Sequence, residues 1–136
     1  MDAISMYREE ILEHYRTPQN FGRLTSFDIS SKQLNPFCGD EIEMFVQFEE
    51  SSRGANLKSP LGCKAKKISF MGKGCAISIA SASILTDFVK GKSIKELTKF
   101  SEEDMLVLLG IQVSETRKKC ALLALAVLKD CLYGKV

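Results

Sequence analysis

Four residues combine the chemistry of metal ligands with positions at the ends of expected structural elements: Cys38, Asp40, Cys75 and Cys120. In extended backbone, residues i and i+2 project to the same side, so Cys38 and Asp40 can face one centre across Gly39. Cys75 opens one expected helix, and Cys120 lies near the start of another. Three thiolates and one carboxylate make a four-coordinate donor set suited to zinc or to iron bonded with sulfide.

The surroundings of Cys75 and Cys120 favour the thiolate, which is the form that binds metal and acts as a nucleophile. A helix N-terminus offers N–H groups and partial positive charge to a thiolate. Cys120 is also preceded directly by three cations, Arg117, Lys118 and Lys119. Because a carboxylate is a harder ligand than thiolate, we expect a mixed site to release its metal or cluster more readily than a four-cysteine site.

Other interpretations remain open from the residues alone. Cysteine is among the most often buried residue types, so any single thiol is also consistent with a place in the core. Asp40 is also consistent with a turn carboxylate that hydrogen-bonds backbone. Cys63 and Cys131 are expected to be core or spare thiols, and Cys131 would lie roughly 16 Å along one helix from Cys120. His14, the single histidine, is expected to hydrogen-bond the loop that follows the first helix.

The composition predicts an ordinary globular protein. The 136 residues are 45% hydrophobic and 26% charged, which suits one domain spanning residues 1–136. The net charge of +2 is too small to indicate nucleic-acid binding. No apolar run reaches the roughly 18 residues of a membrane span, and the acidic N-terminal segment does not resemble a secretion signal. We therefore expect a cytoplasmic protein whose five cysteines serve metal or thiol chemistry and not disulfides.

Hydrophobic periodicity predicts strands in the first half of the chain after one helix. That helix is expected over 4–16, and a turn-rich hairpin tip over 50–62. Three strands are expected, the first on weaker signals than the others, over 26–34, 41–49 and 65–72. The order of elements predicts an α+β fold, with a small antiparallel sheet of about three strands and helices packed on one face.

The second half of the chain is expected to be helical. A helix between Gly74 and Gly91 should carry an apolar stripe of Ile77, Ala80, Ile84 and Phe88. Two short helices should follow, each opening with a serine three residues before an acidic residue. An apolar helix from about Glu115 to Leu132 should end the fold.

The motifs around the four residues resemble those of a known family. The segments "NPFCGDEIEMFVQF", "GKGCAISIASASILTDFVKGKS" and "RKKCALLALAVLKD" resemble, in order, the ligand-bearing segments of the U-type iron–sulfur cluster assembly scaffolds, which include the NifU N-terminal domain, IscU and SufU. The opening "ILEHYRTPQNFGRL" is similar to that family's first helix and loop. The resemblance covers nearly the whole chain and implies a SufE/NifU-like α+β fold.

The resemblance also implies a function. Cys38, Asp40, Cys75 and Cys120 would hold a transient [2Fe–2S] cluster, or Zn²⁺ at the same site. Such a scaffold accepts sulfur from a cysteine desulfurase, binds iron and passes the cluster to apo-proteins, without being a turnover enzyme. Cys120 is our candidate for the persulfide acceptor. The alternative is a zinc-dependent sulfurtransferase partner of the desulfurase, of the SufU type.

The chain departs from IscU-type members at two points, and its other markers are those of a hybrid between the IscU and SufU types. Lys119 stands where IscU-type members have a histidine, and its role as thiolate partner or ligand stays open. The Leu-Pro-Pro-Val-Lys motif is absent, which argues against handover by a dedicated Hsp70-type chaperone. Cys120 follows Cys75 by 45 positions (120 − 75), an interval like that of the IscU type, although the serine-rich helix after Cys75 is closer to SufU.

Overall fold

The computed structural model describes residues 3–36, 39–49 and 62–135, and its elements follow the expected order. The first half of the chain contributes α1 (Ala3–Arg16), β1 (Ile29–Leu34), β2 (Glu41–Phe48) and β3 (Ala65–Lys73). The second half contributes α2 (Ala76–Val89), α3 (Ile94–Thr98), α4 (Glu102–Leu109) and α5 (Glu115–Lys135). The predicted hairpin tip over 50–62 lies almost entirely outside the described residues.

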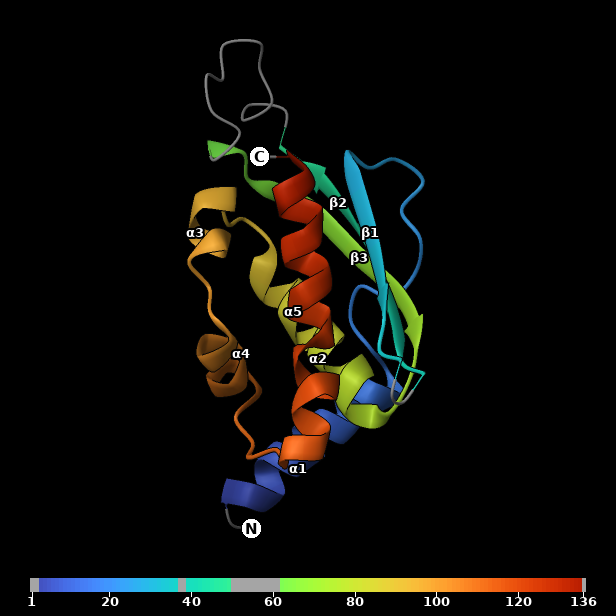
Figure 1. Ribbon diagram of the computed structural model, residues 1–136, viewed down its shortest axis with the longest axis vertical. Helices are drawn as coiled ribbons and strands as arrows, with labels where there is room; N and C mark the ends of the chain where they lie inside the picture. Colours follow the sequence, from blue (N-terminus) through green and yellow to red (C-terminus); the bar gives the residue numbers. More distant parts are fainter. Residues whose placement is uncertain (1–2, 37–38, 50–61, 136) are drawn as a thin grey trace.

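The three strands form one antiparallel sheet in the order β1-β2-β3, with helices packed on one face (Figure 1). α2 and α5 contact the sheet directly, whereas α3 and α4 lie on the far side of α5 (Figure 1). α1 packs against α2. The predicted α+β fold with a small antiparallel sheet is therefore confirmed.

β2 supplies the centre of the core because alternate residues face the helices. Ile42, Met44, Val46 and Phe48 are fully buried there, as the alternation predicts. Phe45 points to the opposite face but is also fully buried. Its ring is covered by Phe27 at 5.1 Å between centroids and by the guanidinium of Arg23, also at 5.1 Å. The segment between α1 and β1 therefore covers part of the second face.

The helix boundaries follow local signals in the sequence. Both short helices begin with a complete capping box, Ser93 with Glu96 in α3 and Ser101 with Asp104 in α4. The four residues of the predicted stripe on α2 belong to the core or pack against it, but the buried surface of this helix is wider than one stripe. Ser78, Ser81, Ser83 and Leu85 are all fully buried, since α2 packs between the sheet, α1, α4 and α5.

Candidate metal centre

The register of the sheet brings Asp40 and Cys75 to the same end of the molecule. Glu41, the first residue of β2, pairs with Lys73, the last residue of β3. The residue before β2 and the residues after β3 therefore lie side by side. At that end Asn35 closes the β1–β2 turn by donating its N–H to the Asp40 carbonyl at 2.7 Å. Gly39 in this turn has φ +76°, a backbone conformation that glycine adopts without steric cost.

The close approach of Asp40 to the β3–α2 junction depends on Gly74. A Cβ atom on Gly74 would lie 2.7 Å from Oδ1 of Asp40, which is shorter than a normal contact. With no side chain at this position, the Asp40 carboxylate reaches the start of α2. The N–H of Cys75 donates to Asp40 Oδ1 at 3.3 Å, and Cys75 Sγ lies 3.7 Å from Oδ2.

Cys120 completes a cluster of three possible ligands. It lies in the second turn of α5, where its side chain is 3% exposed. The ligand atoms of Asp40, Cys75 and Cys120 all lie within 4.8 Å of one another. Three of the four residues singled out in the sequence thus meet at one point. The fourth, Cys38, lies outside the described residues, so its role as a ligand stays a prediction.

Ser78 belongs to the cluster and was missed by the sequence analysis. It is fully buried on α2, its hydroxyl donates to Asp40 Oδ2, and its Oγ lies 3.5 Å from Cys75 Sγ. The available signal was its spacing, because a residue three positions after the helix cap lies on the same face as the cap. That spacing shows which face Ser78 shares with Cys75, but not that Asp40 would be its partner.

The thiol of Cys75 is biased toward the thiolate. Burial raises the pKa of Cys75, but hydrogen bonds from the side chain and backbone of Ser78 and from the thiol of Cys120 lower it by more. The net pKa lies below the ordinary value for a thiol, although the charge of Asp40 opposes the shift. Cys75 is the N-cap residue of α2, so the expectation of a helix N-terminus at this thiol is confirmed.

Cys120 lies near the start of α5, as expected, but beyond the N–H groups that a helix N-terminus leaves free. Residues beyond the first four of a helix have their N–H groups bonded within it, and Cys120 is the sixth residue of α5. Of the neighbouring cations, Arg117 and Lys119 are exposed. The ammonium of Lys118 lies 3.3 Å from the Glu115 carboxylate. The start of α5 therefore provides a buried thiol that lies beyond the free N–H groups of the helix.

The three side chains suit a thiophilic metal. Around a tetrahedral zinc ion, bond lengths of 2.0–2.3 Å separate the ligand atoms by about 3.5–3.8 Å. The 3.7 Å between Cys75 Sγ and Asp40 Oδ2 already matches that spacing. Thiolates and carboxylates both bind zinc, and thiolates hold iron–sulfur clusters. With one carboxylate and two thiols described, a fourth ligand would be needed to close the site.

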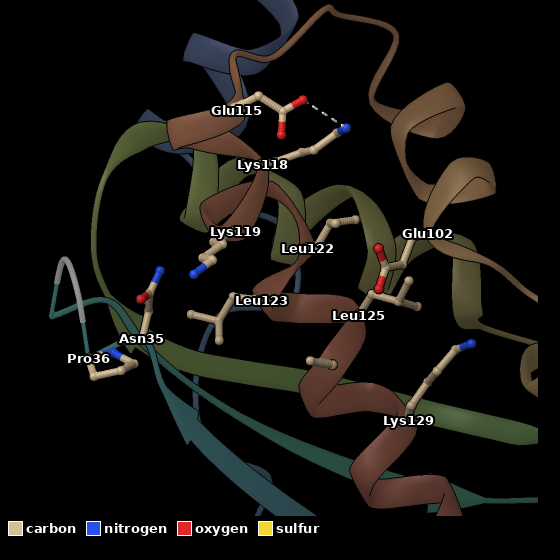
Figure 2. A pocket seen from close by; sticks show the side chains of 11 residues that line it. Asn35, Pro36, Glu102, Glu115, Lys118, Lys119, Leu122, Leu123, Leu125 and Lys129 are labelled. Atoms are coloured by element: carbon tan, nitrogen blue, oxygen red, sulfur yellow. Dashed lines mark hydrogen bonds and ion pairs between the residues drawn. The ribbon is translucent and has the colours of Figure 1, made fainter.

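A groove lies beside this cluster, between α4, α5 and the β1–β2 turn (Figure 2). Its volume is about 570 Å³. Leucines of α5 line it together with Lys118, Lys119, Lys129 and the turn residues Asn35 and Pro36. Figure 2 shows the Lys119 side chain extending toward the turn that bears Asn35. Lys119 thus faces the groove, and its role as thiolate partner or ligand stays a prediction.

The remaining cysteines and the histidine have structural positions. Cys63 and Cys131 are 3% and 2% exposed and belong to the core, in agreement with one of the two expectations. His14 hydrogen-bonds Ser83 of α2 at 2.7 Å, and the same Ser83 oxygen accepts the N–H of Gln19 at 2.8 Å. His14 therefore supports the loop after α1 through Ser83, and not by the direct contact expected.

The fold and the three side chains define a class of protein: a small α+β domain with two thiols and a carboxylate brought together at one end of the sheet. Residues 6–134 match the family model described as NifU-like N terminal domain. The chain belongs to this family, and the resemblance found in its motifs is confirmed. Among the described residues, no helix combines the length and apolar character required to cross a membrane.

The relatives include one named for each of the two predicted alternatives, cluster assembly and zinc-dependent sulfur transfer. The chain is 29% identical over 132 residues to "Iron-sulfur cluster assembly enzyme IscU" of Drosophila melanogaster, covering 95% of this chain and 77% of that protein. It is 31% identical over 137 residues to "Zinc-dependent sulfurtransferase SufU" of Bacillus subtilis, covering 88% and 84%.

A solved structure supports the fold. It is described as an iron–sulfur cluster assembly scaffold protein for the SUF system, from Fervidobacterium islandicum. It superposes with a TM-score of 0.73 at 22% identity and covers 96% of this chain and 99% of that one. At this identity the likeness concerns the fold alone.

Proposed function

We propose that this chain is a scaffold for iron–sulfur cluster assembly. One observation carries the proposal: the ligand atoms of Asp40, Cys75 and Cys120 all lie within 4.8 Å of one another. In this role the chain accepts sulfur from a cysteine desulfurase and binds iron. It then holds a transient [2Fe–2S] cluster on these three residues and Cys38 and transfers it to apo-proteins. The chain acts as a single domain in the cytoplasm and as an assembly scaffold, not as a turnover enzyme.

Sulfur enters by thiol–persulfide exchange. A thiolate of the scaffold attacks the outer sulfur of the desulfurase persulfide. The sulfur–sulfur bond of the desulfurase breaks, a new one forms on the scaffold, and the desulfurase thiol is regenerated, so no oxidant is required. Conversion of that sulfur to sulfide then takes two electrons from an external electron donor. The carrier of the persulfide is Cys120, and because this thiol is 3% exposed, the site has to open for the transfer.

A reconstitution experiment tests the scaffold role. The protein is purified anaerobically and supplied with cysteine, a cysteine desulfurase, ferrous iron and a thiol reductant, while visible absorption and metal content are recorded. We expect charge-transfer bands that are lost in Cys75→Ser and in Cys120→Ser but kept in the matched control Cys131→Ser, a core thiol. Bands of equal intensity in all four proteins would refute the proposed cluster ligands.

The persulfide acceptor is identified separately by mass spectrometry of peptides after incubation with desulfurase and cysteine alone. We expect a mass increase of one sulfur on the peptide of Cys120 that persists in Cys75→Ser. Because Cys75 is more exposed than Cys120 and favours the thiolate, it is the competing acceptor. Persulfide found on Cys75 and unaffected by Cys120→Ser would assign the role to Cys75.

A zinc-dependent sulfurtransferase is the second candidate. It is favoured by the 31% identity to the Bacillus subtilis protein of that name and by a donor set that suits zinc. In this role the same residues would hold zinc, one of the cysteines would accept the sulfur, and no cluster would be built. Tightly bound zinc in one-to-one ratio, faster turnover of the desulfurase and no charge-transfer bands in the reconstitution would favour this role over the scaffold.

A further inference from the structure

We propose that Ser78 is a positioning residue that holds the Asp40 carboxylate in place for metal binding. This inference rests on the metal site proposed above and adds a residue to it. The hydroxyl of Ser78 donates to Asp40 Oδ2, while Asp40 Oδ1 accepts the N–H of Cys75 at 3.3 Å. Both carboxylate oxygens therefore have a partner on the first turn of α2.

The carboxylate has little freedom to move around these contacts. Asp40 is 3% exposed and Ser78 is fully buried, so bulk water cannot replace the hydroxyl if it is removed. Gly74 borders the opposite side, where even a single added carbon would lie 2.7 Å from Oδ1. The carboxylate is thus held between the backbone of the β3–α2 junction and the hydroxyl of Ser78.

This arrangement is compatible with metal binding by the same carboxylate. An ionised carboxylate offers about four lone-pair sites, so Oδ2 can accept from Ser78 while sites remain for a cation. Hydrogen-bond donors to ligating carboxylates orient the ligand, and their removal typically weakens metal affinity by about 10–100-fold. We therefore expect Ser78 to act on the metal through Asp40, without itself being a ligand.

The test measures zinc dissociation constants by competition with a chromophoric chelator. Ser78→Ala is expected to raise the dissociation constant by about 10–100-fold. The matched control is Ser81→Ala, because Ser81 is also fully buried on α2 but its hydroxyl has no hydrogen-bond partner in the described part of the chain. Ser81→Ala should leave the constant within threefold of the wild type.

A double-mutant cycle separates positioning from general packing. If Ser78 acts through Asp40, Ser78→Ala should change zinc affinity by less than threefold in the Asp40→Ala background. Cobalt supplies an independent signature, since the visible bands of bound Co²⁺ should shift in Ser78→Ala and stay unchanged in Ser81→Ala. An equal loss of affinity in both backgrounds would show a merely structural role and overturn the inference.

A second pair of variants keeps the inference testable if Ser78→Ala does not fold. Threonine and valine have nearly the same shape and differ by the hydroxyl, so Ser78→Thr should bind zinc more tightly than Ser78→Val by at least tenfold. Equal affinities in that pair would overturn the inference. If Asp40→Ala weakens zinc binding and Ser78→Ala does not, the Ser78 inference alone fails. A wild type that binds neither zinc nor cobalt would overturn the metal site as well.

Discussion

At the scale of single residues, Asp40 is a hard ligand that lies beside two soft ones, the thiols of Cys75 and Cys120. Its carboxylate is buried and is held by Ser78 and the N–H of Cys75. Where iron or zinc behaves as a soft metal, thiolates bind it more strongly than a carboxylate does. In a four-ligand site that contains Asp40, the carboxylate is therefore the ligand that exchanges most easily, and release of the cluster should begin there.

Replacing Asp40 is expected to prolong the life of a bound cluster. Asp40→Ala removes the exchangeable ligand and leaves an apolar methyl group where the thiolate of an acceptor protein would enter. Decay of the visible absorption after addition of an apo-protein should become several-fold slower. Asp87→Ala is the control, because Asp87 is an exposed aspartate of α2 in an ion pair with Lys90. A cluster that decays faster in Asp40→Ala would contradict this role for the carboxylate.

Cys131 makes the stability of the protein sensitive to alkaline pH. Burial, assisted by the charge of Asp130, raises the pKa of Cys131 from 9.0 to about 12. The folded state therefore keeps this thiol protonated at a pH where the unfolded chain ionises it. The resulting stability is fully present below pH 9 and is lost as the pH rises toward 12.

The measurement is urea unfolding at several pH values in the wild type and in Cys131→Ala. The variant should be less stable at every pH because it leaves a cavity in the core. Between pH 9 and pH 10, however, the wild type should lose about 1 kcal/mol more than the variant, because the thiol titration is absent from the variant. Parallel curves for the two proteins would show that Cys131 ionises as easily in the folded state as in the unfolded chain.

At the scale of elements, the features that could be predicted from the sequence are those set by residues close together in the chain. Both capping boxes, the helix over 4–16 and the strand over 41–49 were predicted because their signals are local. β1 begins at Ile29, later than the predicted 26, because its two-residue alternation is weak. The contact between Ser78 and Asp40 was not predictable, since it depends on pairing Glu41 with Lys73. No local pattern in the sequence specifies that register.

The junction between β3 and α2 provides a prediction at this scale. Gly74→Ala should place a methyl group against Asp40 Oδ1, at 2.7 Å before any adjustment. The carboxylate has to shift, and we expect zinc affinity to fall about 10-fold, as for the loss of an orienting contact. In the Asp40→Ala background, Gly74→Ala should change zinc affinity little, because the carboxylate that its methyl group would displace is absent.

Gly91→Ala is the control for the effect of alanine in place of glycine. Gly91 has φ +82°, and an added Cβ would have no atom within 4 Å, so alanine there should cost roughly 1–2 kcal/mol of stability through backbone strain alone. It lies beyond the far end of α2 from Cys75, and zinc affinity should be unchanged. Loss of zinc affinity in Gly91→Ala as large as in Gly74→Ala would indicate a global effect and not a local one.

At the scale of the whole molecule, the three possible ligands come from separate parts of the fold. Asp40 comes from the end of the β1–β2 turn, Cys75 from the start of α2 and Cys120 from α5. α2 and α5 are also the helices that cover the sheet. A metal on these three residues would therefore cross-link the two helices to the sheet at one end, and its binding energy would add to the stability of the entire domain.

Zinc should consequently raise the thermal stability of the whole domain. At a free zinc concentration 100 times the dissociation constant, the expected stabilisation is about 2.7 kcal/mol, or on the order of 10 °C in the unfolding midpoint for a chain of this size. Thermal unfolding followed by far-UV circular dichroism measures the shift, and removal of zinc with a chelator should reverse it. Cys75→Ala should lose most of the shift, whereas Cys63→Ala, which alters a core thiol away from the cluster, should keep it. A shift of the same size in Cys75→Ala would mean that zinc binds elsewhere, because a ligand stabilises the folded state only through the site that holds it.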